Sequence, residues 1–254
     1  MSDMASMVGP SAAAPVVVVT GASRGLGRGC ALAFGAQGAE VIAVARRREE
    51  LESVVAEIHR RGGRARAITC DVTRPGEVAR LFSGLPRCDV LINNAGMNRP
   101  QPFLDVDPGT LDEVLALNVR SMFVTAQAAA RLMARARSGV IINMSSQMGH
   151  VGAASRTVYC MTKHAIEGLT KAMAVELGPL GIRVNAVAPT YIETPMTQPY
   201  FADDSFRQEV LRRIPLGRIG TIDEVVAAVT FMASPAAGLI TGTSLRVDGG
   251  YTAQ

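Results

Sequence analysis

Short runs rich in Val, Ile and Ala recur along the chain, and stretches with a helical pattern separate them. The runs show little alternation between apolar and polar residues, which is typical of parallel strands buried on both faces. They span Val16–Thr20, Val41–Ala45, Ala65–Cys70, Val90–Asn93, Gly139–Met144, Arg183–Ala188 and Ser244–Val247. Because strands and helices alternate over short connections, we predict a doubly wound α/β fold with about seven parallel strands and helices on both faces.

Several helix ends can also be placed from the sequence. Asp107 is suited to cap a helix that has Pro108 in its first position. Thr221 and Glu224 form a capping-box pattern, and Gly178 followed by Pro179 predicts a helix end. Residues 1–14 are small and polar, so we expect a flexible leader ahead of a single domain over residues 15–254.

The composition limits the class of protein. Of the 254 residues, 48% are hydrophobic and 19% are charged, which indicates a globular chain. The net charge of +4 is modest and no long basic stripe is present, which argues against a nucleic-acid partner. No apolar run reaches the roughly 18 residues of a membrane span. Four scattered cysteines favour reduced thiols over a metal site, so we expect a cytoplasmic protein without a bound metal.

A glycine-rich turn follows the first predicted strand and opens a helix expected over Gly27–Phe34. The turn reads Thr-Gly-Ala-Ser-Arg-Gly-Leu-Gly over Thr20–Gly27. Glycines let the backbone turn tightly and approach a pyrophosphate, which then lies at the helix N-terminus. The alternative is a tight structural turn, but the strand before it and the helix after it favour a dinucleotide site.

Tyr159 and Lys163 are four residues apart and would share one face of a helix. A nearby ammonium group favours the phenolate form of a tyrosine, which then can exchange a proton with a carbonyl or an alcohol. Taken alone, such a pair is more often a partly exposed helical contact. Only the other motifs around it in the sequence favour a catalytic role.

These patterns together resemble the short-chain dehydrogenase/reductase family. The resemblance rests on the spacing of the glycines in Thr20–Gly27, on the Asn-Asn-Ala-Gly sequence of Asn93–Gly96, and on Tyr159 with Lys163. It extends from about Pro15 to Tyr251. It implies a Rossmann fold and an oxidoreductase that moves a hydride between a nicotinamide cofactor and a carbonyl or secondary alcohol.

The resemblance also implies a catalytic set. Tyr159 would transfer the proton, while Lys163 would bind the cofactor ribose and lower the pKa of the tyrosine. Ser146, thirteen residues before Tyr159, would bind the substrate oxygen, and its neighbour Ser145 would be structural. Asn118 would support a water that connects to the lysine; its place within a helix is otherwise unfavourable for Asn.

The end of the second predicted strand bears on the choice of cofactor. An NAD site usually has an Asp or Glu there, whereas this chain has Ala45 followed by Arg46, Arg47 and Arg48. Three arginines at a helix start are unfavourable unless an anion offsets them, and the 2′-phosphate of NADP would do so. With Arg24 in the glycine loop, this pattern favours NADP(H) over NAD(H), which stays possible; the alternative is a solvated basic turn.

Other cofactor contacts follow from the resemblance alone. In the glycine loop it implies Gly21, Ser23, Arg24, Gly25, Leu26 and Gly27. Further along it implies Arg46, Asp71, Val72, Asn94, Ala95, Gly96, Tyr159, Lys163, Pro189, Ile192 and Thr194. The chain departs from the family at Thr190, where a Gly usually follows Pro189. Because a β-branched residue disfavours positive φ, the local turn is expected to differ.

The predicted substrate pocket combines Ser146 with five further residues and a lid over Pro195–Arg213. The five are Gln147, Met148, His150, Arg156 and Tyr191. Polar side chains at its mouth favour a sugar, polyol or sugar acid. The alternatives are a 3-oxoacyl reductase acting on an acyl carrier protein or CoA thioester, and a non-catalytic NADP-binding sensor or scaffold, which predicts a broken catalytic set. Ala- and Met-rich helices after Asp107 and around Tyr159 predict a homodimer or homotetramer.

Overall fold

A computed structural model describes residues 14–195, 197–198 and 200–254, and within them seven parallel strands form one sheet. The strand order is β3-β2-β1-β4-β5-β6-β7. The strands are β1 (Val16–Thr20), β2 (Glu40–Ala45), β3 (Arg64–Thr69), β4 (Val90–Asn93), β5 (Gly139–Met144), β6 (Ile182–Pro189) and β7 (Ser244–Val247). The predicted doubly wound α/β fold is confirmed, and every strand end lies within one residue of its prediction.

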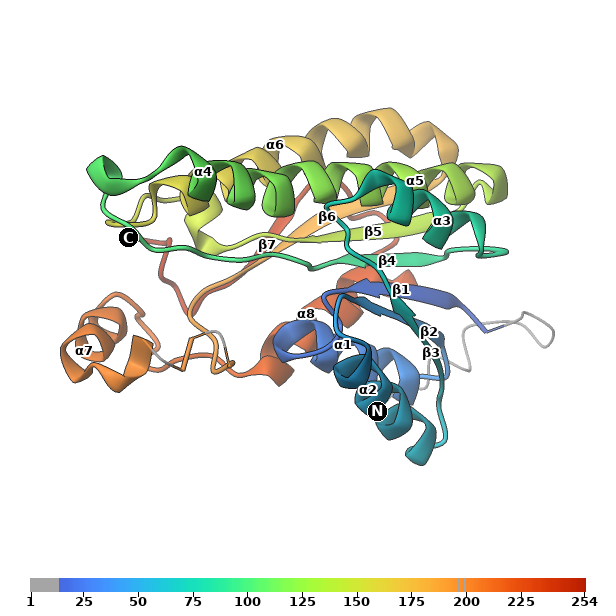
Figure 1. Cartoon of the computed structure of the whole chain (residues 1–254), viewed down its shortest axis with the longest axis horizontal. Helices are drawn as coiled ribbons and strands as arrows, with labels where there is room; N and C mark the ends of the chain where they lie inside the picture. Colours follow the sequence, from blue (N-terminus) through green and yellow to red (C-terminus); the bar gives the residue numbers. More distant parts are fainter. Residues whose placement is uncertain (1–13, 196, 199) are drawn as a thin grey trace.

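Helices cover both faces of this sheet (Figure 1). They are α1 (Gly25–Ala36), α2 (Arg48–Arg60), α3 (Pro75–Ser83), α4 (Pro108–Leu115), α5 (Ser121–Ala136), α6 (Thr157–Leu177), α7 (Asp204–Arg212) and α8 (Ile222–Ala233). In Figure 1, α1, α2 and α8 lie below the sheet, and α3 to α6 lie above it. None of the helices in the described ranges is both long and apolar enough to cross a membrane.

Alternate residues of each buried strand serve two separate cores. Val17 and Val19 of β1 belong to the apolar cluster under α1, α2 and α8. Val16 and Val18 belong to the cluster under α3, α5 and α6. Because successive strand residues point to opposite faces, a sheet covered on both sides requires apolar residues at every position. This requirement explains the unbroken Val and Ile runs in the sequence.

The predicted helix signals are also present. The Asp107 carboxylate accepts a hydrogen bond from the Thr110 amide at 2.9 Å, and Thr221 with Glu224 forms the full capping box at α8. Helix α6 ends at Leu177, immediately before Gly178 and Pro179. Both ends predicted for the first helix were wrong by two residues: it spans Gly25–Ala36 rather than Gly27–Phe34, so part of the glycine turn is already helical.

Two buried amide side chains attach α6 to the middle of the sheet. Asn93 Nδ2 donates to Asn143 Oδ1 at 3.2 Å and to the Met122 carbonyl at 2.8 Å. Asn143 Nδ2 in turn donates to Thr170 Oγ1 of α6 at 3.0 Å. Buried amides are costly without partners, so these bonds fix the position of α6 against β4 and β5.

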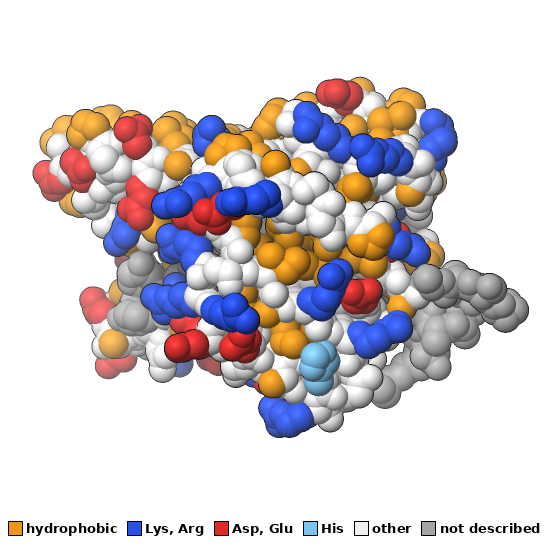
Figure 2. Space-filling view, turned by 45° about the vertical axis from the view of Figure 1, so that its right-hand side comes forward, with side chains coloured by type: hydrophobic (Ala, Val, Ile, Leu, Met, Phe, Trp, Pro, Cys, Tyr) orange, Lys and Arg blue, Asp and Glu red, His pale blue; other side chains and the backbone are white. Residues whose placement is uncertain are grey.

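The two halves of the sheet meet where β1 and β4 lie side by side. The chain leaves these strands in opposite directions, and ligands of such folds bind beyond the carboxyl ends of the strands at this point. Asn94, just after β4, donates from Nδ2 to the Thr20 carbonyl at 2.9 Å and thereby ties the two strand ends together. On the face that Figure 2 shows, Lys and Arg side chains lie among acidic and apolar ones.

Candidate active site

The glycine turn after β1 has a shape that larger residues would not allow. Gly21 and Gly25 have φ of +64° and +54°, which favours glycine. A side-chain carbon on Gly27 would collide with the Gly21 carbonyl oxygen and come within 2.6 Å of Asn94 Nδ2. No side chain caps the N-terminus of α1, and its first turn holds no acidic residue. Its N–H groups and positive dipole end are therefore suited to a phosphate.

A cavity of about 230 Å³ opens at this turn and runs along the carboxyl ends of the neighbouring strands. Most of the predicted cofactor residues line it: Gly21, Ser23, Arg24, Gly25, Leu26, Arg46, Asp71, Val72, Asn94, Ala95, Gly96 and Thr194. Ala45, which replaces the usual acidic residue, also lines the cavity. Residues that are far apart in sequence are thus brought together as the resemblance implies.

The three arginines after β2 differ in what they contact. Arg47 pairs with Glu50 at 2.6 Å and Arg48 pairs with Glu52 at 2.7 Å, both on the outer surface of α2. The expectation that three arginines need an external anion was therefore too strong, because α2 supplies two carboxylates itself. Arg46 forms no ion pair with a described residue and faces the cavity beside Asp71.

Glu50 also lines the cavity, although no sequence pattern predicted a carboxylate at this position. Hydrogen bonds from Arg47 and Ser23 hold the pKa of Glu50 below its ordinary value, so it is charged. Its position on α2 is one turn beyond the strand end at which an acidic residue was sought. Helical spacing would have placed Glu50 on the same side as Arg46 or Arg47, but its contact with Ser23 depends on how α2 packs against the glycine turn.

The predicted proton-transfer group lies at the start of α6. Tyr159 is half-buried and hydrogen-bonded to Ser146, and burial raises the pKa of Tyr159 to about 12 despite that bond. Lys163 lies one turn further on, with its Nζ 5.5 Å from the centre of the tyrosine ring. Its ammonium donates to the Met144 carbonyl at 2.7 Å. Burial lowers the pKa of Lys163 to about 8, and the nearby Glu167 opposes this effect.

Asn118 lies in a π-helical turn, Ala116–Arg120, between α4 and α5. Its Oδ1 accepts from the Met97 amide at 2.9 Å, and its Nδ2 donates to the Met97 carbonyl at 2.8 Å. A side-chain carbon on Gly96 would lie 3.3 Å from Asn118 Oδ1 and 3.9 Å from Lys163 Nζ. Asn118 therefore approaches Lys163 across Gly96, in a turn type that is frequent at functional sites.

Ser146 follows β5 and lies in a short turn that also holds Gln147 and Met148. Its Oγ donates to Gln147 Oε1 at 2.7 Å and accepts from the Met148 amide at 3.2 Å. All three residues are buried. Ser145 points elsewhere, towards Gly149, and its Oγ has no hydrogen-bond partner among the described residues. The two hydroxyl groups thus have different surroundings, and the roles of both serines stay predictions.

Two more of the predicted pocket residues lie near Tyr159. Tyr191 packs edge-on against Phe201 and Phe206, with ring centres 6.1 and 5.9 Å apart. The positive charge of Arg156 acts on both Tyr159 and Tyr191. Arg156 and Tyr191 are thus close enough to Tyr159 to act electrostatically on its hydroxyl.

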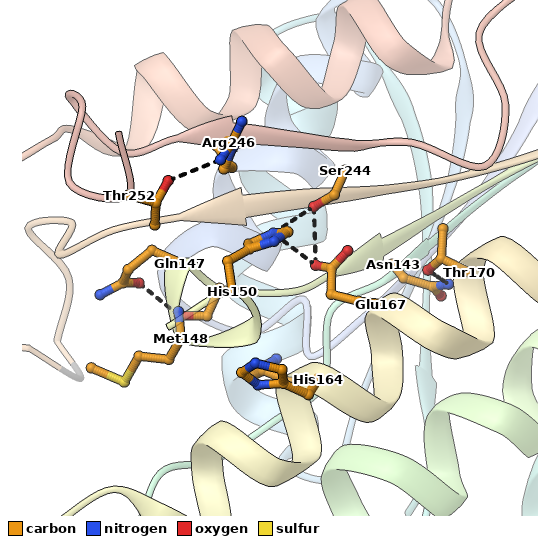
Figure 3. A network of polar contacts seen from close by, with 12 residues as sticks. Asn143, Gln147, Met148, His150, His164, Glu167, Thr170, Ser244, Arg246 and Thr252 are labelled. Carbon is orange, nitrogen blue, oxygen red and sulfur yellow. Dashed lines mark hydrogen bonds and ion pairs between the residues drawn. The ribbon is translucent and has the colours of Figure 1, made fainter. Parts of the chain in front are cut away.

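His150, which is predicted to line the substrate pocket, contacts β7 and α6. Its Nε2 lies 3.1 Å from Ser244 Oγ and 3.3 Å from Glu167 Oε1 (Figure 3). Glu167 is two helical turns beyond Tyr159, so the imidazole is engaged well away from the tyrosine hydroxyl. Because Ser244 is 94 residues away along the chain, no local pattern predicts this contact. A place for His150 in the substrate pocket stays a prediction.

The segment after β6 approaches the glycine turn. Pro189 ends β6, and Ile192 is buried and bridges to Gly220. Thr194 lines the cavity beside Gly25. Thr190 keeps an ordinary φ, because Arg137 and Ser155 are the only described non-glycine residues with positive φ. The replacement of the usual glycine is thus accommodated without strain.

The predicted lid over Pro195–Arg213 contains α7, which lies beyond the edge of the sheet, at the left in Figure 1. Residues 196 and 199 of this segment, and residues 1–13 of the predicted leader, lie outside the described residues.

The cavity and its surroundings fit a dinucleotide cofactor. The glycine cradle leaves room for backbone contact with a pyrophosphate, the open N-terminus of α1 offers N–H donors, and Arg46 adds a cation at one end. Lys163 Nζ lies close to Gly96 of the cavity wall, and the Tyr159 ring lies beside that ammonium. This arrangement can hold a dinucleotide next to a proton donor.

Comparisons with known proteins agree with this geometry. A family model described as enoyl-(acyl carrier protein) reductase matches residues 21–252. L-xylulose reductase of Bos taurus is 40% identical over 237 residues, which cover 93% of this chain and 96% of that protein. The 3-oxoacyl-[acyl-carrier-protein] reductase of Synechocystis is 39% identical and covers 93% and 96%.

A solved structure shows the same fold with a cofactor bound. It is a gluconate 5-dehydrogenase from Burkholderia cenocepacia in complex with NADP and tartrate, with a TM-score of 0.91 and 30% identity. The match covers 94% of this chain and 96% of that one. The chain therefore belongs to the short-chain dehydrogenase/reductase family and is an oxidoreductase.

Proposed function

We propose that this protein uses NADP(H) to interconvert a carbonyl and a secondary alcohol, with Tyr159 exchanging the proton. The observation that carries the proposal is the convergence of three side chains from separate elements. Tyr159 is hydrogen-bonded to Ser146, and the buried ammonium of Lys163 lies beside the tyrosine ring. The rival function, a non-catalytic sensor or scaffold, has no need of this convergence.

In the direction of reduction, each residue has a separate task. Ser146 donates a hydrogen bond to the carbonyl oxygen of the substrate, and Tyr159 supplies the proton that this oxygen takes up. The positive charge of Lys163 stabilises the phenolate that remains, and Asn118 connects the lysine to water. The bound cofactor supplies the hydride. Because burial raises the pKa of Tyr159 to about 12, the hydroxyl is protonated and ready to act as an acid at neutral pH.

The proposed substrate is a sugar, a polyol or a sugar acid. Gln147 lies beside Ser146, and the charge of Arg156 reaches Tyr159, so hydroxyl or carboxylate groups of a substrate would find partners there. The named activities of the L-xylulose reductase and gluconate 5-dehydrogenase relatives support this class. The alternative is a 3-oxoacyl reductase, which the Synechocystis relative supports. We also expect a cytoplasmic location, with which four buried, unpaired cysteines are consistent.

A panel of substrates distinguishes a sugar, polyol or sugar-acid enzyme from a 3-oxoacyl reductase. Ketoses, polyols, sugar acids and β-keto esters are each supplied with NADPH or NADP⁺, and the absorbance of the reduced nicotinamide is followed. We expect kcat/KM to be highest for a sugar, polyol or sugar acid. A clear preference for β-keto esters would contradict the proposed substrate and favour the 3-oxoacyl reductase. An absence of turnover on every compound would favour the sensor or scaffold.

Tyr159→Phe tests the proton-transfer role. The substitution keeps the ring and removes the hydroxyl, so turnover should fall by roughly 10²–10⁴. Cofactor affinity, measured by quenching or enhancement of NADPH fluorescence, should change little and serves as the internal control for folding. A Phe variant with turnover near that of the wild type would show that another group supplies the proton.

The cofactor preference follows from Ala45, Arg46 and Arg24, which all line the cavity. Charge-assisted hydrogen bonds contribute about 1.5–3 kcal/mol each, and exposure reduces this. One or two such contacts to the 2′-phosphate favour NADP⁺ by roughly 10- to 1,000-fold. The double change Ala45→Asp with Arg46→Ala should reverse the preference, because it adds an acceptor and a repulsive charge.

The measurement is kcat/KM for both cofactors at low salt. The matched control is Arg48→Ala, since Arg48 is exposed and paired with Glu52, and this change should leave the preference as it is. A wild-type protein that preferred NAD⁺ would mean that Arg46 belongs to a solvated basic turn.

We also propose that the protein assembles through the outer faces of α5 and α6. Phe123 of α5 is 49% exposed, and Met161 and Val175 of α6 are 47% and 80% exposed. Covering such residues in a symmetric pair removes apolar surface from water. Light scattering at micromolar concentration should give a mass of two or four times 26.7 kDa, and Val175→Lys should lower it. A monomer mass for the wild type would refute this assembly.

A further inference from the structure

A buried carboxylate on α6, the helix that carries Tyr159 and Lys163, has no part in the proposed function. Glu167 is only 7% exposed and lies four residues after Lys163, on the same side of α6. A buried carboxylate is costly unless hydrogen bonds or opposite charges surround it. Glu167 therefore needs partners at this buried position.

Two residues from other parts of the fold anchor Glu167 (Figure 3). Ser244, at the start of β7, donates to Glu167 Oε1 at 3.0 Å. His150, in the turn after β5, places Nε2 3.3 Å from the same oxygen and 3.1 Å from Ser244 Oγ. One carboxylate oxygen is thus held by the turn that carries Ser146 and by the last strand of the sheet.

Gly149 fixes the distance between this turn and α6. A side-chain carbon on Gly149 would lie 3.1 Å from the Lys163 carbonyl oxygen and 3.2 Å from Glu167 Cγ. The turn therefore lies directly on the helix between the lysine and the glutamate. Because there is no room for a side chain there, the position of His150 against Glu167 is set by backbone packing.

The surroundings of Lys163 show what this carboxylate can do. From β5 the ammonium meets the neutral Met144 carbonyl, from α6 it meets the Tyr159 ring, and across Gly96 it approaches the neutral Asn118 amide. Glu167 is the charged group that acts on the lysine, and it opposes the effect of burial, which lowers the pKa of Lys163 to about 8. Groups that face the glutamate are His150 from the turn and Ser244 from β7.

We infer that Glu167 is a positioning residue for Lys163: anchored by His150 and Ser244, its carboxylate stabilises the buried ammonium and keeps it charged at neutral pH. The catalytic consequence rests on the proposed function, in which a charged Lys163 supports Tyr159. A lysine with a pKa near 8 is roughly nine-tenths charged at pH 7, whereas a pKa one unit lower would leave about half of it charged. A modest electrostatic contribution from Glu167 therefore changes the fraction of Lys163 that is charged at neutral pH.

The sequence makes a direct test practical, because Lys163 and Lys171 are the only two lysines in the chain. Protein labelled with ¹³C in the lysine side chains gives two ε-carbon signals whose midpoints can be followed by NMR between neutral and alkaline pH. Lys171 is exposed and serves as an internal reference. The experiment uses the full chain without cofactor or substrate.

Three substitutions separate the charge of Glu167 from its shape. Glu167→Gln keeps the hydrogen-bond acceptor, and Glu167→Met keeps approximately the volume, but both remove the charge. Each should move the Lys163 midpoint down by roughly one pH unit and leave Lys171 unmoved. If the Gln variant does not fold, the Met variant can be measured in its place, since apolar replacements of buried charges are often tolerated. Glu167→Asp retains the charge and should keep the midpoint near the wild-type value.

The matched control is Glu176→Gln, which makes the same change on the same helix at an exposed position more than three turns from Lys163. It should leave both lysine midpoints where they are. An unchanged Lys163 midpoint in a folded Gln or Met variant would overturn the inference. An equal shift of both lysines would also overturn it, because it would indicate a general loss of structure.

The failure of this inference can be told apart from failure of the proposed function. In an active enzyme, the alkaline limb of kcat/KM for NADPH-dependent reduction should move down by the same roughly one unit in Glu167→Gln. An active enzyme without the NMR shift refutes the role of Glu167 alone. A protein with the NMR shift but without activity on any substrate refutes the proposed function alone.

Discussion

When a parallel sheet is covered by helices on both faces, polar groups gather beyond the ends of its strands. In this protein the strands contribute apolar side chains to two cores, so nearly every position of β1, β2 and β4 is committed to packing. The carboxyl ends are different, because there the chain turns into loops and helices. Thr20, Asn94 and Ser146 all lie immediately at or after such ends. The site is therefore a consequence of the sheet rather than a feature added to it.

Buried polar side chains then set the distances within the site. Asn93 and Asn143 attach α6 to the sheet through Thr170, while Asn94 joins the ends of β1 and β4. Each of these amides sits where an unpaired group would be costly, so the positions of the elements are narrowly defined. Lys163 depends on this arrangement, because its ammonium reaches the Met144 carbonyl only if α6 lies close to β5.

Much of this could be predicted from the sequence, because the relevant signals are local. Unbroken Val and Ile runs gave the strands to within one residue, and Asp107 and the Thr221–Glu224 pattern gave two helix starts. The features that could not be predicted from the sequence depend on contacts between segments that are far apart along the chain. His150 contacts Ser244, which is 94 residues away in the sequence, and Glu50 of α2 contacts Ser23 of the glycine turn. No periodicity or propensity reports such contacts, and the π-helical turn at Asn118 likewise depends on the Met97 backbone that it binds.

A crystal structure of the full chain with NADP⁺ tests the central claim most directly, which is that one cavity at the carboxyl edge delivers this cofactor to Tyr159. The account predicts that the pyrophosphate lies on the N-terminus of α1, that the 2′-phosphate is within hydrogen-bond distance of Arg46 or Arg24, and that the nicotinamide ring lies beside Tyr159 and Ile192. A dinucleotide bound elsewhere, or one whose nicotinamide ring lies away from the Tyr159 hydroxyl, would contradict it.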